Sequence, residues 1–268
     1  MTRKPACNRI RLEALMGFSC FIITKNEARK LRAVIESVRD LADEVIVIDS
    51  GSDDDTVLIA ETAGARVIHH DWPGFGAQKR FGEDQCRNDW VLNLDGDEVL
   101  SEELRAEIRA LFAAGLPPLP CYWLRISAVP PFGNGKPWRF NRIDRIRLYD
   151  RRIVRFPDHA TWDAIASPKS VPVVRFKGLV LHYWMQDFAH QLDKMNRYTT
   201  ALAENVPKKS MASLTLRLFF GFPFDFLRAY LLRGHIAGGR YGFAVAMLYA
   251  FTRLMRTVKM MERQWTKT

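Results

Sequence analysis

Near the start of the chain the apolar residues change from a continuous run to a helical period. Residues 18–24 (FSCFIIT) form an apolar run rich in β-branched side chains, which predicts a strand buried on both faces. Within residues 28–39 the apolar positions fall at i, i+3, i+4 and i+7, which predicts an amphipathic helix: Leu31, Val34, Ile35 and Val38. This segment is therefore expected to form a strand followed by a helix that packs on it.

The same strand-then-helix pattern recurs through the following segment. Apolar runs predict strands over 44–49, 66–70 and 90–94, and helical spacing predicts helices over 56–63 and around 79–86. Strands joined by helices in this way lie parallel, and right-handed crossovers between them build a doubly wound sheet. We therefore predict a Rossmann-like α/β fold with a mostly parallel central sheet.

The composition is that of a folded globular protein, but the charge is unevenly placed. The 268 residues include 40 Lys+Arg against 30 Asp+Glu, and 48% are hydrophobic, which suits one large α/β domain with an appendage, or two small domains. From residue 207 onward eleven basic residues stand against Asp225 and Glu262, so this segment carries +9 of the formal charge of +10. A basic segment suits nucleic acid, an anionic membrane surface or an acidic ligand. The sequence has no RNP-like strand, zinc-finger spacing or helix-turn-helix signature, which argues against nucleic acid.

The basic segment has the pattern of a helical extension. If residues 241–263 are helical, apolar residues fall on one arc, and Arg253, Arg256, Lys259 and Arg263 fall on the other. Such a helix can lie on an anionic membrane surface, and we predict this contact, with Leu218–Phe224 as an additional apolar insertion loop. The alternative is that the apolar arc packs on the catalytic domain, and both can hold. The longest uncharged apolar stretch here, 241–252, is shorter than the roughly 20 residues of a spanning helix, so we expect a peripheral protein.

The cysteines and the N-terminal residues predict a cytoplasmic location. Cys7, Cys20, Cys86 and Cys121 lie far apart with no CxxC spacing, so we interpret them as packing residues in a reducing compartment. Residues 1–17 are basic without the apolar run of a secretory signal. We expect the protein at the inner face of the cytoplasmic membrane.

Polar clusters follow three of the predicted strands. They are Thr24–Glu27, Asp49–Asp54 and Asp95–Glu98. Open α/β sheets bind ligands at the carboxyl ends of parallel strands, so these clusters predict a binding site along one edge. Asp, Ser and Gly are also ordinary loop and helix-capping residues, which is the structural alternative for each cluster taken alone.

Asp95-Gly96-Asp97 carries the most specific chemistry of the three clusters. Two carboxylates around a small residue suit Mg²⁺ or Mn²⁺, which binds one or two carboxylates together with diphosphate oxygens. An isolated Asp-Gly is also a common turn. No GxGxxG follows the first strand and no GxxxxGK[ST] occurs, which argues against dinucleotide redox chemistry and against a P-loop NTPase.

Four ordered segments carry a resemblance to a known family: FIITKNEARKLRAVIESV, DEVIVIDSGSDDDT, HHDWPGFGAQKR and WVLNLDGDE. They resemble the family 2 inverting glycosyltransferases of GT-A fold, and within these the bacterial lipopolysaccharide-core β-glycosyltransferases. The resemblance implies an N-terminal extension over 1–17, a GT-A catalytic domain over 18–206 and a basic, membrane-associated helical region over 207–268. Within the catalytic domain, 18–100 would bind the nucleotide sugar and 101–206 the acceptor.

The resemblance also implies roles for single residues on the donor side. The base and ribose of a UDP-sugar would be held by a set from the first two clusters: Thr24, Asn26, Glu27, Asp49, Ser50 and Gly51. Lys79 would lie near the base or the diphosphate, with a solvated surface lysine as the alternative. Asp95 would face the ribose or the metal, and Asp97 the divalent metal.

An inverting transfer needs a general base that removes the proton of the acceptor hydroxyl. Related enzymes often have a His-Glu pair where this chain has Trp162-Asp163, so we predict Asp163 as the base and Asp158 as the second candidate; the alternative is that both are loop residues. His182 is a candidate metal or phosphate ligand, or a packed histidine. Arg147 is a candidate for diphosphate or acceptor phosphate, or an exposed strand arginine.

The resemblance therefore implies a metal-dependent enzyme that moves a hexose, with glucose as the preferred candidate, from a UDP-sugar to a lipid-linked glycan such as the lipopolysaccharide core. Three alternatives stay open: a different polysaccharide or polyprenyl-phosphate acceptor, a sugar nucleotidyltransferase, and a non-catalytic sugar-nucleotide-binding module. Nucleotidyltransferases usually have a Gly-rich basic loop after the first strand, where this chain has KNEARK.

Overall fold

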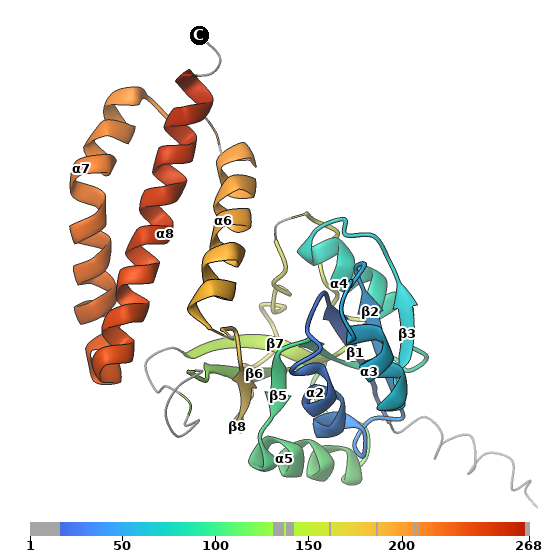
Figure 1. Ribbon diagram of the computed structural model, residues 1–268. Helices are drawn as coiled ribbons and strands as arrows, with labels where there is room; N and C mark the ends of the chain where they lie inside the picture. Colours follow the sequence, from blue (N-terminus) through green and yellow to red (C-terminus); the bar gives the residue numbers. More distant parts are fainter. Residues whose placement is uncertain are drawn as a thin grey trace, which may run out of the picture. The chain divides into compact units, whose positions relative to one another are not determined.

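The protein is described by a computed structural model covering residues 17–130, 137, 142–160, 162–185, 187–205, 207 and 209–265. The chain divides into two compact units. The first unit comprises Met1–Ser127 and Ile143–His182, and the second comprises Ala128–Arg142 and Tyr183–Thr268. The first unit holds the sheet and the second the C-terminal helices (Figure 1).

The first unit begins with the predicted parallel half-sheet. Its strands are β1 (Ser19–Thr24), β2 (Glu44–Asp49), β3 (Arg66–His69) and β4 (Trp90–Asp95), in the order β3-β2-β1-β4 with parallel pairing throughout. Helices α2 (Leu31–Val38), α3 (Thr56–Thr62) and α4 (Phe75–Asp84) connect them (Figure 1). The predicted strands and helices of this half are confirmed to within a few residues.

The second half of the sheet is formed by strands that pair differently. After β5 (Glu98–Leu100) and helix α5 (Glu102–Ala113) come β6 (Cys121–Ala128), β7 (Arg142–Asp150) and β8 (Arg175–His182). They continue the sheet in the order β4-β7-β6-β8-β5, with β7 antiparallel to β4 and β8 antiparallel to β5. The α/β class is confirmed, and the antiparallel half brings the end of β8 beside the start of β5.

The core lies on both faces of β1, β2 and β4. The predicted apolar stripe of α2 is fully buried against the sheet, as are Ile22, Val47 and Leu92 of the central strands. Cys20, Cys86 and Cys121 are free and buried, as expected of packing residues. Cys7 lies outside the described residues.

The second unit consists of helices. They are α6 (Phe188–Asn205), α7 (Met211–Leu227), a π-helical turn η1 (Arg228–Leu232), a 3₁₀ turn η2 (His235–Gly238) and α8 (Gly239–Trp265). Helix α8 contains the predicted helix 241–263, and it packs against both α6 and α7 (Figure 1). In the part of the chain that the structure describes, no helix is both long and apolar enough to cross a bilayer.

Two expectations about the second unit change. Leu218–Phe224 is not a loop but lies inside α7, because the apolar run keeps a helical period despite Gly221 and Pro223. The basic arc of α8 is also not all exposed. Lys259 Nζ donates to Thr200 Oγ1 of α6 at 2.7 Å, and Arg263 donates to the carbonyl oxygen of Ala203.

Candidate active site

The ends of three neighbouring strands meet at one edge of the sheet. Thr24 of β1 is in register with Asp49 of β2, and Ile23 is in register with Asp95 of β4. Because the three strands are parallel, their carboxyl ends and the loops that follow lie together. The three polar clusters of the sequence therefore share one edge.

The loops after β1 and β2 are tied to each other by hydrogen bonds. Asn26 has a left-handed backbone (φ 57°). Its amide N donates to Ser52 Oγ at 2.9 Å, and its Nδ2 donates to Asp53 Oδ1 at 2.7 Å. The amide of Glu27 donates to Thr56 Oγ1 at 2.9 Å. These bonds fix the two loops that the resemblance assigns to the nucleoside.

The carboxylate of Asp49 shapes its own loop. It is buried, and its Oδ2 accepts hydrogen bonds from the amides of Gly51 and Ser52, both at 2.9 Å. Gly51 has φ 81°, a left-handed conformation that favours glycine. Ser50 Oγ accepts a hydrogen bond from Gln78 Nε2 of α4 at 2.9 Å. The loop is therefore held open at a fixed position by its own side chains and by α4.

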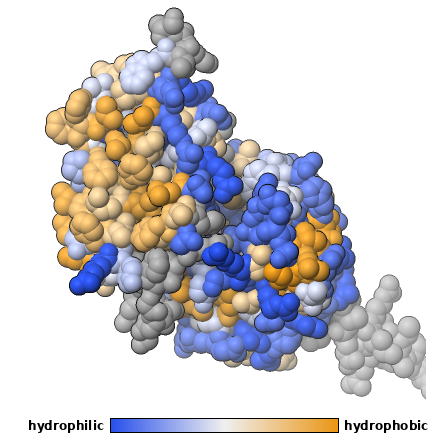
Figure 2. Space-filling model, in the orientation of Figure 1, coloured by the Kyte–Doolittle hydropathy of each residue, from blue (hydrophilic) through white to orange (hydrophobic). Residues whose placement is uncertain are grey.

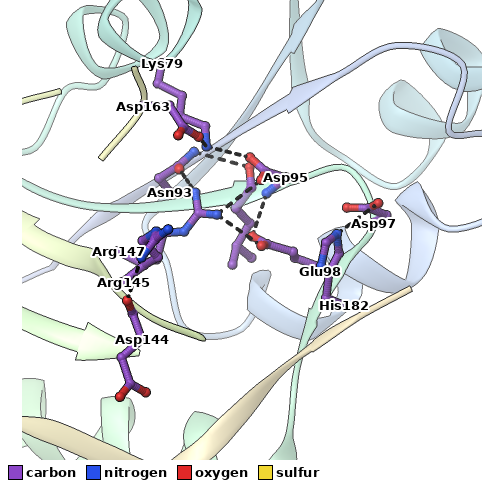
Figure 3. A network of polar contacts seen from close by, with 11 residues as sticks. Lys79, Asn93, Asp95, Asp97, Glu98, Asp144, Arg145, Arg147, Asp163 and His182 are labelled. Atoms are coloured by element: carbon purple, nitrogen blue, oxygen red, sulfur yellow. Dashed lines mark hydrogen bonds and ion pairs between the residues drawn. The ribbon is translucent and has the colours of Figure 1, made fainter. Parts of the chain in front are cut away.

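Lys79 links two carboxylates that lie far apart in the sequence. Its side chain is 1% exposed, and its Nζ lies 3.1 Å from Asp95 Oδ1 and 2.9 Å from Asp163 Oδ2 (Figure 3). The solvated surface lysine considered as an alternative is therefore wrong. Asp163 remains 41% exposed and Asp95 30% exposed, so the ammonium group is buried beneath two carboxylates that solvent or a ligand reaches.

Two glycines allow the segment before Asp163 to approach α4. The amide of Gly76 donates to the carbonyl oxygen of His159 at 3.0 Å, and that of Phe75 to Ala160. A Cβ at Gly76 would lie 2.3 Å from the carbonyl oxygen of Trp162, and Gly74 has φ 118°. The WPGFG sequence thus lets the Asp163 segment lie directly on the helix that carries Lys79. Asp158 is exposed on the same segment and takes no part in these ion pairs.

Arg147 of β7 completes the network from the interior. Its guanidinium donates to Asn93, to Asp95 Oδ2 at 3.1 Å and to Glu98 Oε1 at 3.0 Å (Figure 3). The side chain is 7% exposed, so the exposed strand arginine considered as an alternative is wrong. Arg147 holds the side chain of Asp95 rather than offering its charge at the surface.

The charges of this network determine the protonation of its carboxylates. Burial alone would raise the pKa of Asp95, but the positive charges of Lys79 and Arg147 hold that pKa well below its usual range. Burial raises the pKa of Glu98 despite the nearby Arg147. Asp95 is therefore a fixed anion, and Glu98 lies beneath it as its more easily protonated neighbour.

Asp97 points away from Asp95, toward β8. Its Oδ2 lies 3.3 Å from His182 Nε2, because Glu98 and His182 are directly paired in the β5–β8 ladder (Figure 3). Burial alone would lower the pKa of His182, but the hydrogen bond and charge of Asp97 raise it. A carboxylate oxygen and an imidazole nitrogen are both ligand types for divalent cations, although here the two atoms contact each other as an ion pair. Among the described residues no group of three or more His, Cys, Asp and Glu is arranged to hold a metal ion.

Sequence reasoning missed the inner residues of the network. Asn93 and Glu98 were given no individual role, although Glu98 belongs to the Asp95–Glu98 cluster and Asn93 lies two residues before it. The available signal was the polar Asn93 within the apolar strand WVLNLD, since a buried polar side chain requires a partner. Thr24 Oγ1 is buried without a hydrogen-bond partner, and a Cβ at Gly96 would lie 2.6 Å from it. The turn between Asp95 and Asp97 thus requires glycine.

Comparisons with known proteins show the class to which this site belongs. The family model for glycosyl transferase family 2 matches residues 19–166. An uncharacterized glycosyltransferase of Rickettsia typhi is 35% identical over 91% of this chain and 86% of its own length. The chain therefore belongs to glycosyltransferase family 2, and the family and GT-A fold class implied by the four sequence segments are confirmed.

Two further relatives are more informative by name. The lipopolysaccharide core biosynthesis glycosyltransferase LpsC of Rhizobium meliloti is 29% identical over 94% of both chains. A solved structure of glucosyl-3-phosphoglycerate synthase from Mycobacterium tuberculosis is 25% identical, covers 48% of this chain and 50% of that chain, and has a TM-score of 0.34. The chain thus matches LpsC over nearly its whole length and this solved structure over about half.

Proposed function

We propose that the protein is a metal-dependent inverting hexosyltransferase that moves a hexose from a UDP-sugar to a lipid-linked glycan such as the lipopolysaccharide core. Membership of glycosyltransferase family 2 supports the transfer chemistry, and the name of the LpsC relative supports the acceptor class. We further propose glucose as the sugar and the inner face of the cytoplasmic membrane as the place of action. The nucleotidyltransferase alternative finds no support in the family.

The observation that carries this proposal is the placement of Asp163. It is a partly exposed carboxylate held by Lys79, the same ammonium group that holds Asp95 at the strand edge. An inverting transfer needs a carboxylate on the acceptor side of the sugar and acidic residues on the donor side. We infer that Asp163 takes the acceptor side and Asp95 the donor side, since both contact the ammonium group of Lys79.

The proposed reaction is a single displacement. Asp163 accepts the proton of the acceptor hydroxyl while that oxygen forms a bond to the anomeric carbon. On the opposite face, the bond from the anomeric carbon to the diphosphate oxygen breaks, and its electron pair leaves with UDP. Lys79 keeps Asp163 in place, and Arg147 keeps Asp95 in place. Asp158, exposed and outside the network, becomes the weaker candidate for the base.

The donor would lie along the loops after β1 and β2. Thr24, Asn26 and Glu27 on one side and Asp49, Ser50 and Gly51 on the other are proposed to hold the base and ribose. The hydrogen bonds between these loops leave them preorganised, which lowers the entropic cost of binding.

The donor chemistry of one pair supports the proposed metal dependence. Asp97 and His182 are the residues that would hold Mn²⁺ or Mg²⁺, since a carboxylate and an imidazole are ligand types of divalent cations. When bound, the cation would neutralise the charge of the diphosphate leaving group. Imidazole binds Mn²⁺ more readily than Mg²⁺, which favours Mn²⁺.

The test is transfer of radiolabelled hexose from a panel of UDP-hexoses to a membrane glycolipid extract, with Mn²⁺ or Mg²⁺ supplied. We expect UDP-glucose to be the donor. We also expect UDP-glucose to raise the melting temperature of the protein, because it binds the native state. Label appearing only on polyprenyl phosphate or on a lipid-free polysaccharide would replace the proposed acceptor. Absence of transfer from every UDP-hexose would overturn the proposal.

A further inference from the structure

The second unit contains a basic pocket between α7 and α8. It has a volume of about 260 Å³ and is lined by Arg217, Gly221, Phe224, Asp225, Arg228, Arg253, Leu254, Arg256 and Thr257. Four of these lining residues are arginines and one is a carboxylate. Gly221 has no side chain to occupy the pocket that these residues line.

Most of the positive charge of this pocket is unmatched. Asp225 Oδ2 accepts a hydrogen bond from Arg253 Nε at 2.8 Å, so the one carboxylate is already paired. Within the described part of the chain, Arg217, Arg228 and Arg256 have no acidic partner. Burial, and then the charges of Arg217, Arg256 and Arg253, lower the pKa of the nearby Lys209. This is the electrostatic field of a site that an anion would stabilise.

An apolar stripe runs along α7 beside the pocket. It consists of exposed side chains at helical spacing that continue into η1: Leu216, Phe220, Phe224, Leu227 and Leu231. Figure 2 shows apolar side chains gathered over α7. The pocket residues Arg217 and Arg228 follow stripe residues by one position, about 100° around the helix axis. Phe224 belongs to both the stripe and the pocket wall.

We propose that this pocket binds the phosphate group of an anionic membrane lipid, with the hydrocarbon of the lipid and its neighbours against the apolar stripe of α7. Guanidinium groups bind phosphate oxygens with paired, charge-assisted hydrogen bonds, and exposed Phe and Leu side chains are stabilised in the acyl-chain boundary. The proposal deepens the membrane association proposed above and rests on it for the source of the phosphate. It also limits the contribution of the basic arc of α8 to Arg253 and Arg256, because Lys259 and Arg263 are bound to α6, and it adds Arg217 of α7 and Arg228 of η1.

The experiment measures binding of the full chain to vesicles by co-sedimentation. Vesicles of phosphatidylcholine alone are compared with vesicles that also contain phosphatidylglycerol, and inorganic phosphate is added in a separate arm. The test variant is Arg217→Gln/Arg256→Gln. The matched control is Arg197→Gln/Arg240→Gln, which removes the same charge from exposed positions of the same unit outside the pocket.

We expect the wild type to bind phosphatidylglycerol vesicles and not pure phosphatidylcholine. The pocket variant should lower the partition coefficient about 30-fold, the effect of two basic residues close to an anionic surface, and the control less than about threefold. Arg228→Gln, at an exposed position of η1, should lower it about fivefold and provides a second test if the double variant folds poorly. Phe220→Ser should lower it about tenfold, whereas Leu58→Ser, equally exposed on the first unit, should leave it unchanged.

Three outcomes would overturn the proposal. Equal losses in the two double variants would mean diffuse charge attraction without a pocket. Binding of inorganic phosphate without binding of vesicles would mean a soluble phosphate ligand. Absence of wild-type binding to both would mean that the pocket takes no phosphate. Vesicle binding is measured without sugar transfer. These outcomes can therefore be interpreted even if the proposed transferase activity is not found.

Discussion

Arginine side chains occupy opposite electrostatic surroundings in the two units. In the first unit Arg147 is buried between Asp95 and Glu98, so its charge is fully matched by protein groups. In the second unit Arg217 and Arg256 line an open pocket and have no acidic partner among the described residues. A buried, matched arginine positions other side chains and needs no ligand. Arginines without acidic partners at the surface repel one another, and a bound anion would stabilise them.

The largest effect should come from removing the matched charge. Arg147→Met leaves the buried Glu98 and the partly exposed Asp95 without their common partner, so the free energy of unfolding should fall by about 3–5 kcal/mol. Arg217→Met, in the unmatched group, should change it by less than about 0.5 kcal/mol. Urea unfolding followed by circular dichroism measures both. Equal effects of the two substitutions would contradict the contrast between the units.

The next effect concerns activity rather than stability. Asp163→Asn keeps the size of the side chain and removes the proposed base, so kcat should fall at least about 100-fold, equivalent to about 2.7 kcal/mol. Lys79 keeps its ion pair with Asp95 at 3.1 Å, so the variant should still fold, which circular dichroism checks. Asp158→Asn, on the same segment but outside the network, is the control and should keep near wild-type kcat. Full activity of Asp163→Asn would assign the base elsewhere.

A smaller effect is expected at the pair of Asp97 and His182. Asp97→Asn weakens one of two proposed ligands, so the Mn²⁺ concentration for half-maximal activity should rise roughly tenfold or more, about 1.4 kcal/mol. The control is Asp71→Asn, since Asp71 lies 3.2 Å from His69 in an equally close but exposed pair. Titration of Mn²⁺ into metal-free enzyme measures the shift. An unchanged requirement in Asp97→Asn would remove this pair from the metal site.

The parallel half of the site was predictable from the sequence, and the rest was not. β1, β2 and β4 are apolar runs that end in polar residues, so both the strands and their common edge follow from local pattern. The pairing of Lys79 with Asp163 joins residues 84 positions apart and depends on a loop without periodicity. The contact depends on Gly76, which lets the segment before Asp163 lie against α4. The presence of a glycine in the sequence does not predict which distant segment will pack against it.

The second unit shows the converse limit of local reasoning. Leu218–Phe224 was expected to be an apolar insertion loop, but helix α7 continues through this segment, including Gly221 and Pro223. The uneven charge of the segment was visible in the sequence, whereas the pocket required the packing of α7 on α8. Composition thus indicated a basic surface for an anionic partner, and the tertiary structure determined which arginines form it.

The smallest effects should appear in the pH dependence of stability, where a histidine of each unit reports the local charge. Asp97 raises the pKa of His182 against the effect of burial, whereas burial and then Arg233 lower the pKa of His235. The contribution of His182 to the free energy of unfolding is therefore complete below the pKa of an unfolded histidine, about 6.5. It is lost as the pH rises through the higher pKa of His182 in the folded state. The contribution of His235 is complete above about 6.5 and is lost as pH falls toward its folded pKa.

Substitution of each histidine should remove one side of this profile. With divalent metal removed by EDTA, His182→Gln should flatten the fall in melting temperature on the alkaline side, because the protonated imidazole no longer stabilises the native state through Asp97. His235→Gln should flatten the fall on the acidic side, because no proton then has to be excluded from a buried ring beside Arg233. Melting curves from pH 5 to pH 8 measure both. If both variants flattened the same side of the profile, the carboxylate beside His182 and the burial and arginine beside His235 would not act on the two histidines as described.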